Sequence, residues 1–172
     1  MRQLYFLYGL IVYMNESNNR PEDGQHPWLT SEEQRTWRDW ILVSGRMDTV
    51  LARQLQADSS ISLADYVVLV QLSEHPEKRE RIAVLAEALQ WDRSRLSHQI
   101  TRMAKRELVR RETCSNDGRG AFVAIEDHGL EVIKAAAPGH AGAVREHFFD
   151  QLDPKDVDDL GRILSKLATH LR

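Results

Sequence analysis

Hydrophobic side chains recur three and four residues apart through most of the chain after residue 30, and this spacing is typical of one face of an α-helix. Helices are therefore predicted over about 30–57, 62–75, 82–90, 93–106, 126–152 and from 153 onward. Side chains suited to capping a helix N-terminus precede four of these runs: Thr30 with Glu33, Ser62 with Asp65, Asp92, and Asp153 with Asp156.

Two runs between the fourth and fifth predicted helices have the composition of β-strands. They are "LVRRETC" (108–114) and "AFVAI" (121–125), and "SNDGRG" between them holds the Asn, Asp and Gly of a tight turn. A hairpin is therefore predicted over 108–125. The charged segment "PEKRER" (76–81) is predicted to be a loop. Pro138-Gly139 predicts a kink in the fifth helix. The predicted fold class is mostly α with a small β-hairpin wing, which forms a winged helix-turn-helix domain over 62–125.

The first 27 residues differ from the rest of the chain. The apolar run from Leu4 to Met14 is shorter than the roughly 20 residues that span a bilayer, and residues 15–27 are polar. We predict a flexible N-terminal extension over 1–27 and a folded domain over 28–172. Cys114 is the only cysteine, so no intrachain disulfide is expected, and 42% apolar and 28% charged residues fit a cytoplasmic globular protein.

Positive charge is concentrated in one segment, although the whole chain has a formal net charge of -3. Residues 91–111 read "WDRSRLSHQITRMAKRELVRR" and carry acids only at Asp92 and Glu107. At about 100° per residue, Leu96, Ile100 and Met103 fall on the inward side of the helix. The outward side and its flanks carry polar residues that can hydrogen-bond base edges in a DNA major groove: Ser94, Arg95, Ser97, His98, Gln99, Thr101 and Arg102.

The predicted hairpin tip adds a second basic element. Arg119 lies between two glycines, so its guanidinium is expected to project toward a DNA minor groove, where the negative potential is strong. Asp117 is interpreted as the residue that orients Arg119 or a neighbouring basic side chain. The alternative is that Asp117-Gly118 serves only to form the turn.

With its elements in this order, the chain resembles the MarR family of bacterial transcriptional regulators. "DGRGAFVAIEDHG" (117–129) follows the family's wing pattern of Asp-x-Arg, then Val-x-Leu-Thr, then Gly. "LAEALQWDRSRLSHQITRMAKRELVRR" (85–111) follows its DNA-reading pattern, and the likeness covers about 28–172. Two positions depart from the family: Glu126 replaces the usual capping Thr, and Glu107 replaces a common Gly.

The resemblance implies a homodimer that binds a pseudo-palindromic operator in double-stranded DNA. The dimerisation helices would lie in 28–57 and 126–172. Dimerisation is supported independently by apolar side chains of these terminal segments that cannot all pack on so thin a domain: Trp37, Trp40, Phe148, Phe149 and Leu171. Family members are most often repressors that small, commonly phenolic, ligands release. An effector pocket is expected between the dimerisation helices and the DNA-reading domain, lined by Trp40, Tyr66 and His75.

The same residues bear on other functions. The sequence contains no Gly-rich phosphate loop, nucleophile elbow or metal-binding helix motif, so neither enzymatic activity nor a cofactor or metal site is expected. A zinc sensor using His140, Glu146 and His147 and a redox sensor using Cys114 are alternatives. A winged-helix protein-interaction module and a sequence-indifferent architectural protein are further alternatives. The acid-free basic face argues against the former, and the acidic net charge against the latter.

Overall fold

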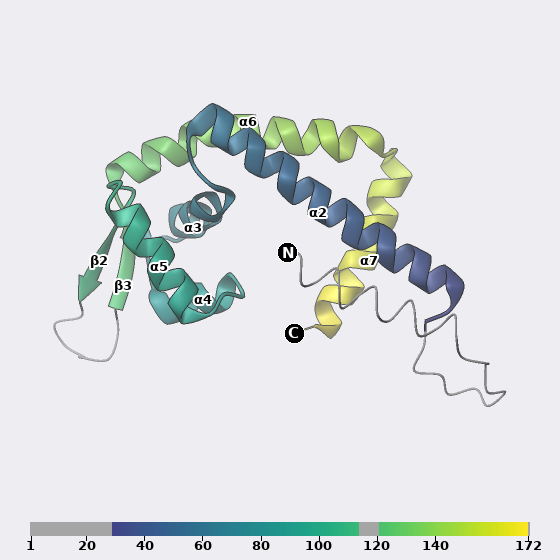
Figure 1. The fold of residues 1–172 in the computed structure, drawn as a ribbon, viewed down its shortest axis with the longest axis horizontal. Coiled ribbons are helices and arrows are strands. Elements are labelled where there is room, and N and C mark those ends of the chain that lie inside the picture. The colour runs from purple at the N-terminus through teal and green to yellow at the C-terminus, as the bar shows by residue number, and fades with distance from the viewer. Residues whose placement is uncertain (1–28, 114–120, 172) are drawn as a thin grey trace. The chain divides into compact units, whose positions relative to one another are not determined.

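The computed structural model describes residues 29–113 and 121–171, and their fold is mostly helical with a small antiparallel sheet. Figure 1 shows the order of the elements along the chain. The helices are α2 (Ser31–Ser59), α3 (Leu63–Glu74), α4 (Ile82–Ala88), α5 (Arg93–Ala104), α6 (Asp127–His147), the 3-10 helix η1 (Phe149–Gln151) and α7 (Pro154–His170). The strands are β1 (Arg79–Arg81), β2 (Val109–Thr113) and β3 (Ala121–Ile125). The predicted fold class is confirmed.

The predicted helix starts are confirmed by the hydrogen bonds that cap them. Thr30 Oγ1 accepts from the amide of Glu33, whose carboxylate accepts from the Thr30 amide, at 3.2 and 2.7 Å. Equivalent reciprocal bonds join Ser62 with Asp65 and Asp153 with Asp156. These local signals fix where α2, α3 and α7 begin because each satisfies amides that have no partner within the helix.

The segment predicted as a charged loop instead contains strand β1. Arg79, Glu80 and Arg81 pair antiparallel with β3, so the sheet has three strands in the order β1-β3-β2. The prediction of a loop was wrong because this strand is only three residues long and entirely polar. Its strand conformation comes from pairing with β3, a segment distant in the sequence, and not from local propensity.

The fifth predicted helix ends earlier than expected. Helix α6 runs through Pro138 and ends at His147, and the separate turn η1 follows it before α7. Glu126 is the N-cap residue of α6 but its side chain makes no capping bond. The backbone amide of Glu126 donates to the carbonyl of Leu108 at 3.0 Å, which fixes the start of α6 on the segment between α5 and β2.

The hydrophobic core lies within the winged helix and the start of α6. Helix α5 packs on α4 and β2, and α3 packs on α5, α6 and the sheet. The largest fully buried side chains come from the end of α2, from α3, α4, α5, β2 and β3, and from the segments between them: Leu55, Ile61, Val68, Leu69, Leu72, Leu85, Leu96, Ile100, Met103, Leu108, Val109 and Val123. Ile133 and Ala136 of α6 are buried beside them. The core therefore holds α5 against the rest of the domain by its apolar side.

Helix α2 crosses the boundary between two compact units of the chain, which divide between Arg46 and Met47. In the first unit, large apolar side chains of α2 are exposed: Trp37, Trp40, Leu42 and Val43. In the second unit, α7 has no buried residue, and three of its large apolar side chains, Ile163, Leu164 and Leu167, are exposed, as is Leu171 directly after it. Among the described residues, no helix is both long enough and apolar enough to cross a membrane.

Candidate nucleic-acid interface

Helix α5 separates an apolar side from a polar side, as its sequence predicts. Leu96, Ile100 and Met103 are 0% exposed. The opposite side of the helix is exposed and carries the following side chains: Arg93, Ser94, Arg95, His98, Thr101 and Arg102. No carboxylate occurs in α5 itself, so this exposed side presents only cationic and neutral polar groups.

The one acid at the start of α5 is occupied by capping. Asp92 Oδ1 accepts from the Ser94 hydroxyl at 2.6 Å and from the Arg95 amide at 2.7 Å. The Ser94 hydroxyl, followed by the Arg95 amide, lowers the pKa of the Asp92 carboxyl. The Arg95 guanidinium lies over the Trp91 ring, with its carbon 4.1 Å from the ring centroid. This cation–π contact holds Arg95 at the end of the helix that recognition helices present to bases.

A second arginine crosses the exposed side of α5 from strand β2. The Arg111 guanidinium donates to the Ser97 carbonyl and hydroxyl, both at 2.9 Å, and to the Thr101 hydroxyl at 3.0 Å. These three hydrogen bonds connect β2 with α5, and the Arg111 guanidinium adds a positive charge to the exposed side of α5. It also means that the Ser97 and Thr101 hydroxyls already serve a protein contact.

The structure contradicts the predicted outward position of Gln99. Its side chain is 3% exposed, with Nε2 donating to Asp65 Oδ1 at 2.6 Å and Oε1 accepting from Arg102. Both ends of the amide therefore have protein partners. Helical spacing placed Gln99 on a flank of α5, and the buried carboxylate of α3 is the reason that this flank faces inward.

The sequence did not predict that Asp65 belongs to this site. Its position three residues after Ser62 is already accounted for by the helix cap. Its Oδ2 also accepts from Arg106 at 2.9 Å, and Arg106 donates in addition to the Ser60 carbonyl at 3.0 Å. Arg106 is thus committed to the α2–α3 turn. No local pattern signals a contact between residues this far apart in sequence.

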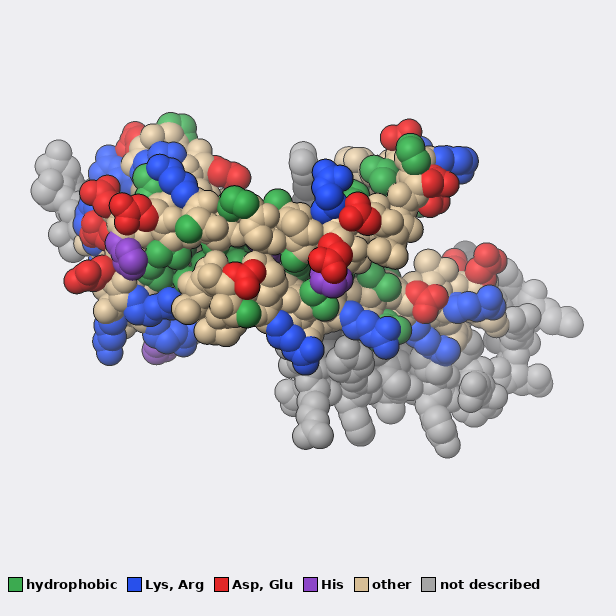
Figure 2. All heavy atoms as spheres, turned by 90° about the horizontal axis from the view of Figure 1, so that it is seen from above, with side chains coloured by type: hydrophobic (Ala, Val, Ile, Leu, Met, Phe, Trp, Pro, Cys, Tyr) green, Lys and Arg blue, Asp and Glu red, His purple; other side chains and the backbone are tan. Residues whose placement is uncertain are grey.

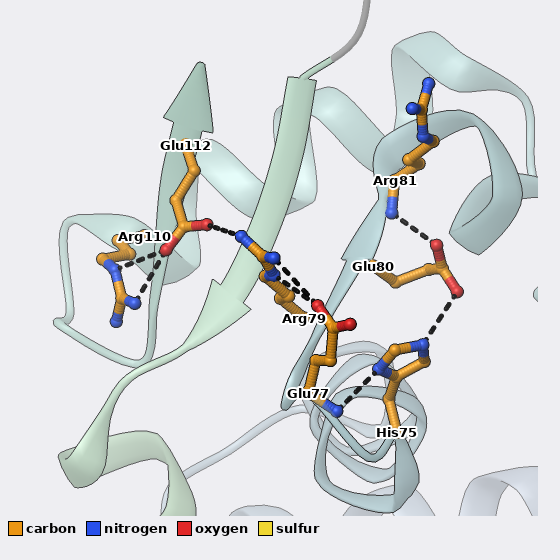
Figure 3. A network of polar contacts seen from close by, with 7 residues as sticks. All are labelled: His75, Glu77, Arg79, Glu80, Arg81, Arg110 and Glu112. Atoms are coloured by element: carbon orange, nitrogen blue, oxygen red, sulfur yellow. Dashed lines mark hydrogen bonds and ion pairs between the residues drawn. The ribbon is translucent and has the colours of Figure 1, made fainter. Parts of the chain in front are cut away.

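Two other arginines near the sheet, Arg79 and Arg110, are paired with acids, as Figure 3 shows. Arg79 pairs with Glu77 and Glu112 at 2.8 and 3.2 Å, and Arg110 pairs with Glu112 at 2.7 Å. The Arg81 side chain points away from these acids in Figure 3. Figure 2 correspondingly shows Asp and Glu beside Lys and Arg over the part of the chain that carries the sheet. The sheet, where acids pair with Arg79 and Arg110, therefore differs from the exposed side of α5, which carries no acid.

The predicted wing tip lies outside the described residues. Asp117, Arg119 and Cys114 all fall within 114–120. The proposed minor-groove contact and the redox alternative thus stay predictions.

The three residues predicted to line an effector pocket have different surroundings. The Tyr66 ring packs on the His140 ring at a centroid distance of 4.2 Å, and burial lowers the pKa of His140. His75 lines a pocket of about 290 Å³ between the end of α3 and α4, and Tyr66 does not line it. Trp40 is exposed and belongs to the unit that ends at Arg46.

The metal-sensing alternative lacks a ligand set in the part of the chain that the structure describes. Within 29–113 and 121–171, no three His, Cys, Asp or Glu side chains come together as metal ligands. His140, the first of the histidines considered, packs on Tyr66, and its Nδ1 is buried without a hydrogen-bond partner there.

Comparison with known proteins agrees with this geometry. The MarR family model matches residues 61–120. The chain is similar to AbsC, a MarR family transcriptional regulator from Streptomyces coelicolor, at 44% identity and a TM-score of 0.79, over 86% of this chain and 99% of that one. It is also similar to Sco3205, a regulator of this family from the same organism solved in complex with DNA, at 43% identity and a TM-score of 0.79, over 84% and 94% of the two chains. The fold is shared with an Escherichia coli MarR mutant complexed with operator DNA, at 21% identity and a TM-score of 0.71, over 81% and 97%. No curated protein shows significant similarity.

Proposed function

Because the chain belongs to the MarR family of DNA-binding transcriptional regulators, we propose that it acts as a homodimer on a pseudo-palindromic operator. Each subunit would place the exposed side of α5 in a major groove, with Arg119 of the wing in the adjacent minor groove. Membership of this family makes the protein a regulator of transcription and not an enzyme.

The exposed side of α5 is the observation that carries the proposal. Arg95 and His98 are exposed near the N-terminal half of the helix, and Arg111 lies across Ser97 from the neighbouring strand. Such side chains can read base edges or contact phosphates, and the absence of a carboxylate in α5 removes the repulsion that phosphates would meet. Sco3205, which is 43% identical, was solved in complex with DNA, which supports the same role here.

Dimerisation is proposed from the apolar side chains that the described chain leaves exposed on its terminal helices. On α7 these are Ile163, Leu164 and Leu167, with exposures of 45%, 40% and 52%. Fully burying an exposed side chain of this kind contributes about 1.5–3 kcal/mol, so covering the exposed half of each would contribute roughly 1 kcal/mol, and several together favour association with a second copy. Segments 28–57 and 126–172 would form this interface. A twofold dimer would present its two recognition helices to half-sites about 34 Å apart.

Base reading by α5 is tested with Arg95→Ala and His98→Ala. Each is expected to lower affinity for a duplex selected from random sequences by repeated binding, by about 1–3 kcal/mol, and to change affinity for unselected DNA much less. Arg119→Ala is expected to weaken both duplexes alike and to reduce the salt dependence, because it would remove a positive charge from the negative potential of the minor groove. Fluorescence anisotropy at several salt concentrations measures all three.

Arg162→Ala is the control for the two arginine variants. Arg162 is an exposed arginine of α7 that pairs with Asp159 and lies on the side of the helix opposite Leu164, so its loss removes the same charge outside the winged helix and away from the apolar side chains proposed to meet the partner. We expect no change in duplex affinity. Equal losses on selected and unselected DNA for Arg95→Ala and His98→Ala would contradict base reading and favour an architectural protein. Failure to bind any duplex would favour a protein-interaction module.

We further propose that the protein is a repressor that a small, phenolic ligand releases from DNA. The support is His140, which packs on Tyr66 and whose buried Nδ1 has no hydrogen-bond partner among the described residues. The buried Oε1 of Gln54, whose side chain lies against Gly139 next to it in the sequence, has no such partner either. Unpaired buried polar atoms favour a ligand that can hydrogen-bond to them.

The ligand response is tested by titrating simple phenols into the complex with the selected duplex. Release of DNA is expected, and Tyr66→Leu is expected to reduce the release without changing DNA affinity in the absence of phenol. If no phenol raises the melting temperature of the free protein or releases DNA, the phenolic effector is refuted.

A further inference from the structure

A buried carboxylate lies directly behind the exposed side of α5. Asp65 and Gln99 are the two polar side chains that the structure buries among the described residues, each 3% exposed. Asp65 Oδ2 accepts from the Ser62 amide at 2.9 Å, from the Ser62 hydroxyl at 2.8 Å and from Arg106 at 2.9 Å. The other oxygen, Oδ1, accepts from Gln99 Nε2 at 2.6 Å. One carboxylate therefore serves both the cap of α3 and the inner flank of α5.

Gln99 carries this contact to the outer side of α5. Because its Nε2 faces the carboxylate, its Oε1 points the other way and accepts from the guanidinium of Arg102. The amide cannot reverse without placing its oxygen against the carboxylate of Asp65. Arg102 itself is exposed, so the chain of bonds begins in the core and ends on the DNA-facing side.

We propose that Asp65 and Gln99 are positioning residues for DNA recognition, because they hold the Arg102 guanidinium in place before DNA arrives. The inference rests on the proposed function above, in which Arg102 is among the α5 residues that contact DNA. An arginine loses side-chain freedom when it binds, which costs about 0.5–1.5 kcal/mol of affinity and corresponds to about twofold to tenfold in the dissociation constant. A guanidinium that is already held loses less freedom, and with five N–H donors it keeps others for DNA.

The cap of α3 does not by itself require the bond to Gln99. The reciprocal bonds between Ser62 and Asp65 complete the capping box within four residues. A buried amide at position 99 contributes little net stability over an apolar side chain of similar size, because burying polar groups has its own cost. The contact across 34 residues between α3 and α5 is therefore better explained by what Gln99 holds on its other side.

A double-mutant cycle between Gln99 and Arg102 tests this role. The variants are Gln99→Met, Arg102→Ala and both together, and anisotropy gives the dissociation constant of each for the selected duplex. Gln99→Met is expected to weaken binding about threefold to tenfold when Arg102 is present, and to have no further effect in the Arg102→Ala background.

Two further variants keep the test decisive. Ser62→Ala disturbs the same cap but leaves the bond from Gln99 to Asp65, so it is expected to lower the melting temperature and leave duplex affinity unchanged. If Gln99→Met does not fold, Asp65→Asn enters the same cycle, because it removes the negative charge that orients the Gln99 amide while keeping the side-chain volume.

The outcomes separate the inference from the proposed function. Equal weakening by Gln99→Met with and without Arg102, or weakening by Ser62→Ala as large as that by Gln99→Met, would show a purely structural role and overturn the inference. Loss of affinity in Arg102→Ala with none in Gln99→Met would overturn it while leaving the proposed function intact. If Arg102→Ala and Arg95→Ala both leave affinity unchanged, DNA contact by α5 fails, and the inference fails with it.

Discussion

Replacing Leu164 and Leu167 with glutamate is expected to give a monomer whose affinity for the selected duplex is lower by at least about 100-fold. Both side chains are exposed on the same side of α7, which has no buried residue. In the proposed dimer they would be buried against the partner, and removing two carboxylates from water there would carry a large desolvation cost. A monomer binds one half-site at a time, so the gain from linking two recognition helices is lost.

Sedimentation equilibrium measures the mass of the protein in solution, and fluorescence anisotropy on the same preparations measures its affinity for the selected duplex. Ser165→Glu is the control, since it adds the same charge per residue at an exposed position turned by about 100° from Leu164. It should leave both the mass and the affinity unchanged. A Leu164→Glu/Leu167→Glu protein that sediments as a dimer would exclude α7 from the interface, and a native protein that sediments as a monomer would exclude the dimer itself.

Local signals in the sequence predicted most of the helical framework. Asp92 caps α5 as predicted, and the apolar triplet Leu96, Ile100 and Met103 is buried as its helical spacing requires. Both features depend on residues within about one turn of each other, so they can be read from the sequence without knowledge of the fold. The exposed positions of Arg95 and His98 follow from the same helical geometry.

Two structural features, strand β1 and the inward position of Gln99, were not predicted because they depend on contacts between segments distant in the sequence. Strand β1 has no alternating pattern and forms by pairing with β3, and Gln99 turns inward because Asp65 of another helix lies there. Helical spacing places a flanking residue only to within a sector of the helix surface, so a single long-range hydrogen bond decides which way the side chain faces.

The two departures from the family pattern also have structural consequences. Glu107 adopts a positive φ of 57°, a left-handed conformation that favours glycine, which is the common residue of the family at this position. Glu126 does not cap α6 and instead pairs with Arg110 at 3.2 Å. The substitution of the capping threonine thus exchanges a cap for an ion pair that is half in solvent and contributes little, about 0–1 kcal/mol.

The glycine that ends the wing pattern is expected to be among the least replaceable residues of the chain. A Cβ at Gly129 would lie 2.1 Å from the carbonyl oxygen of Leu108 and 3.1 Å from Cγ1 of Ile125. Because the first contact is with backbone, which also accepts the amide of Glu126, the start of α6 would have to move off the α5–β2 segment. Gly129→Ala is therefore expected to lower the free energy of unfolding by about 3 kcal/mol or more, measured by urea denaturation.

Gly142→Ala in the same helix is the control. A Cβ at Gly142 would have no neighbour within 4 Å, so the substitution should raise the free energy of unfolding by up to about 1 kcal/mol, because alanine favours the helix over glycine. Similar small changes for both variants would show that α6 can shift at its start without loss of stability, and would leave the family's glycine without a packing explanation.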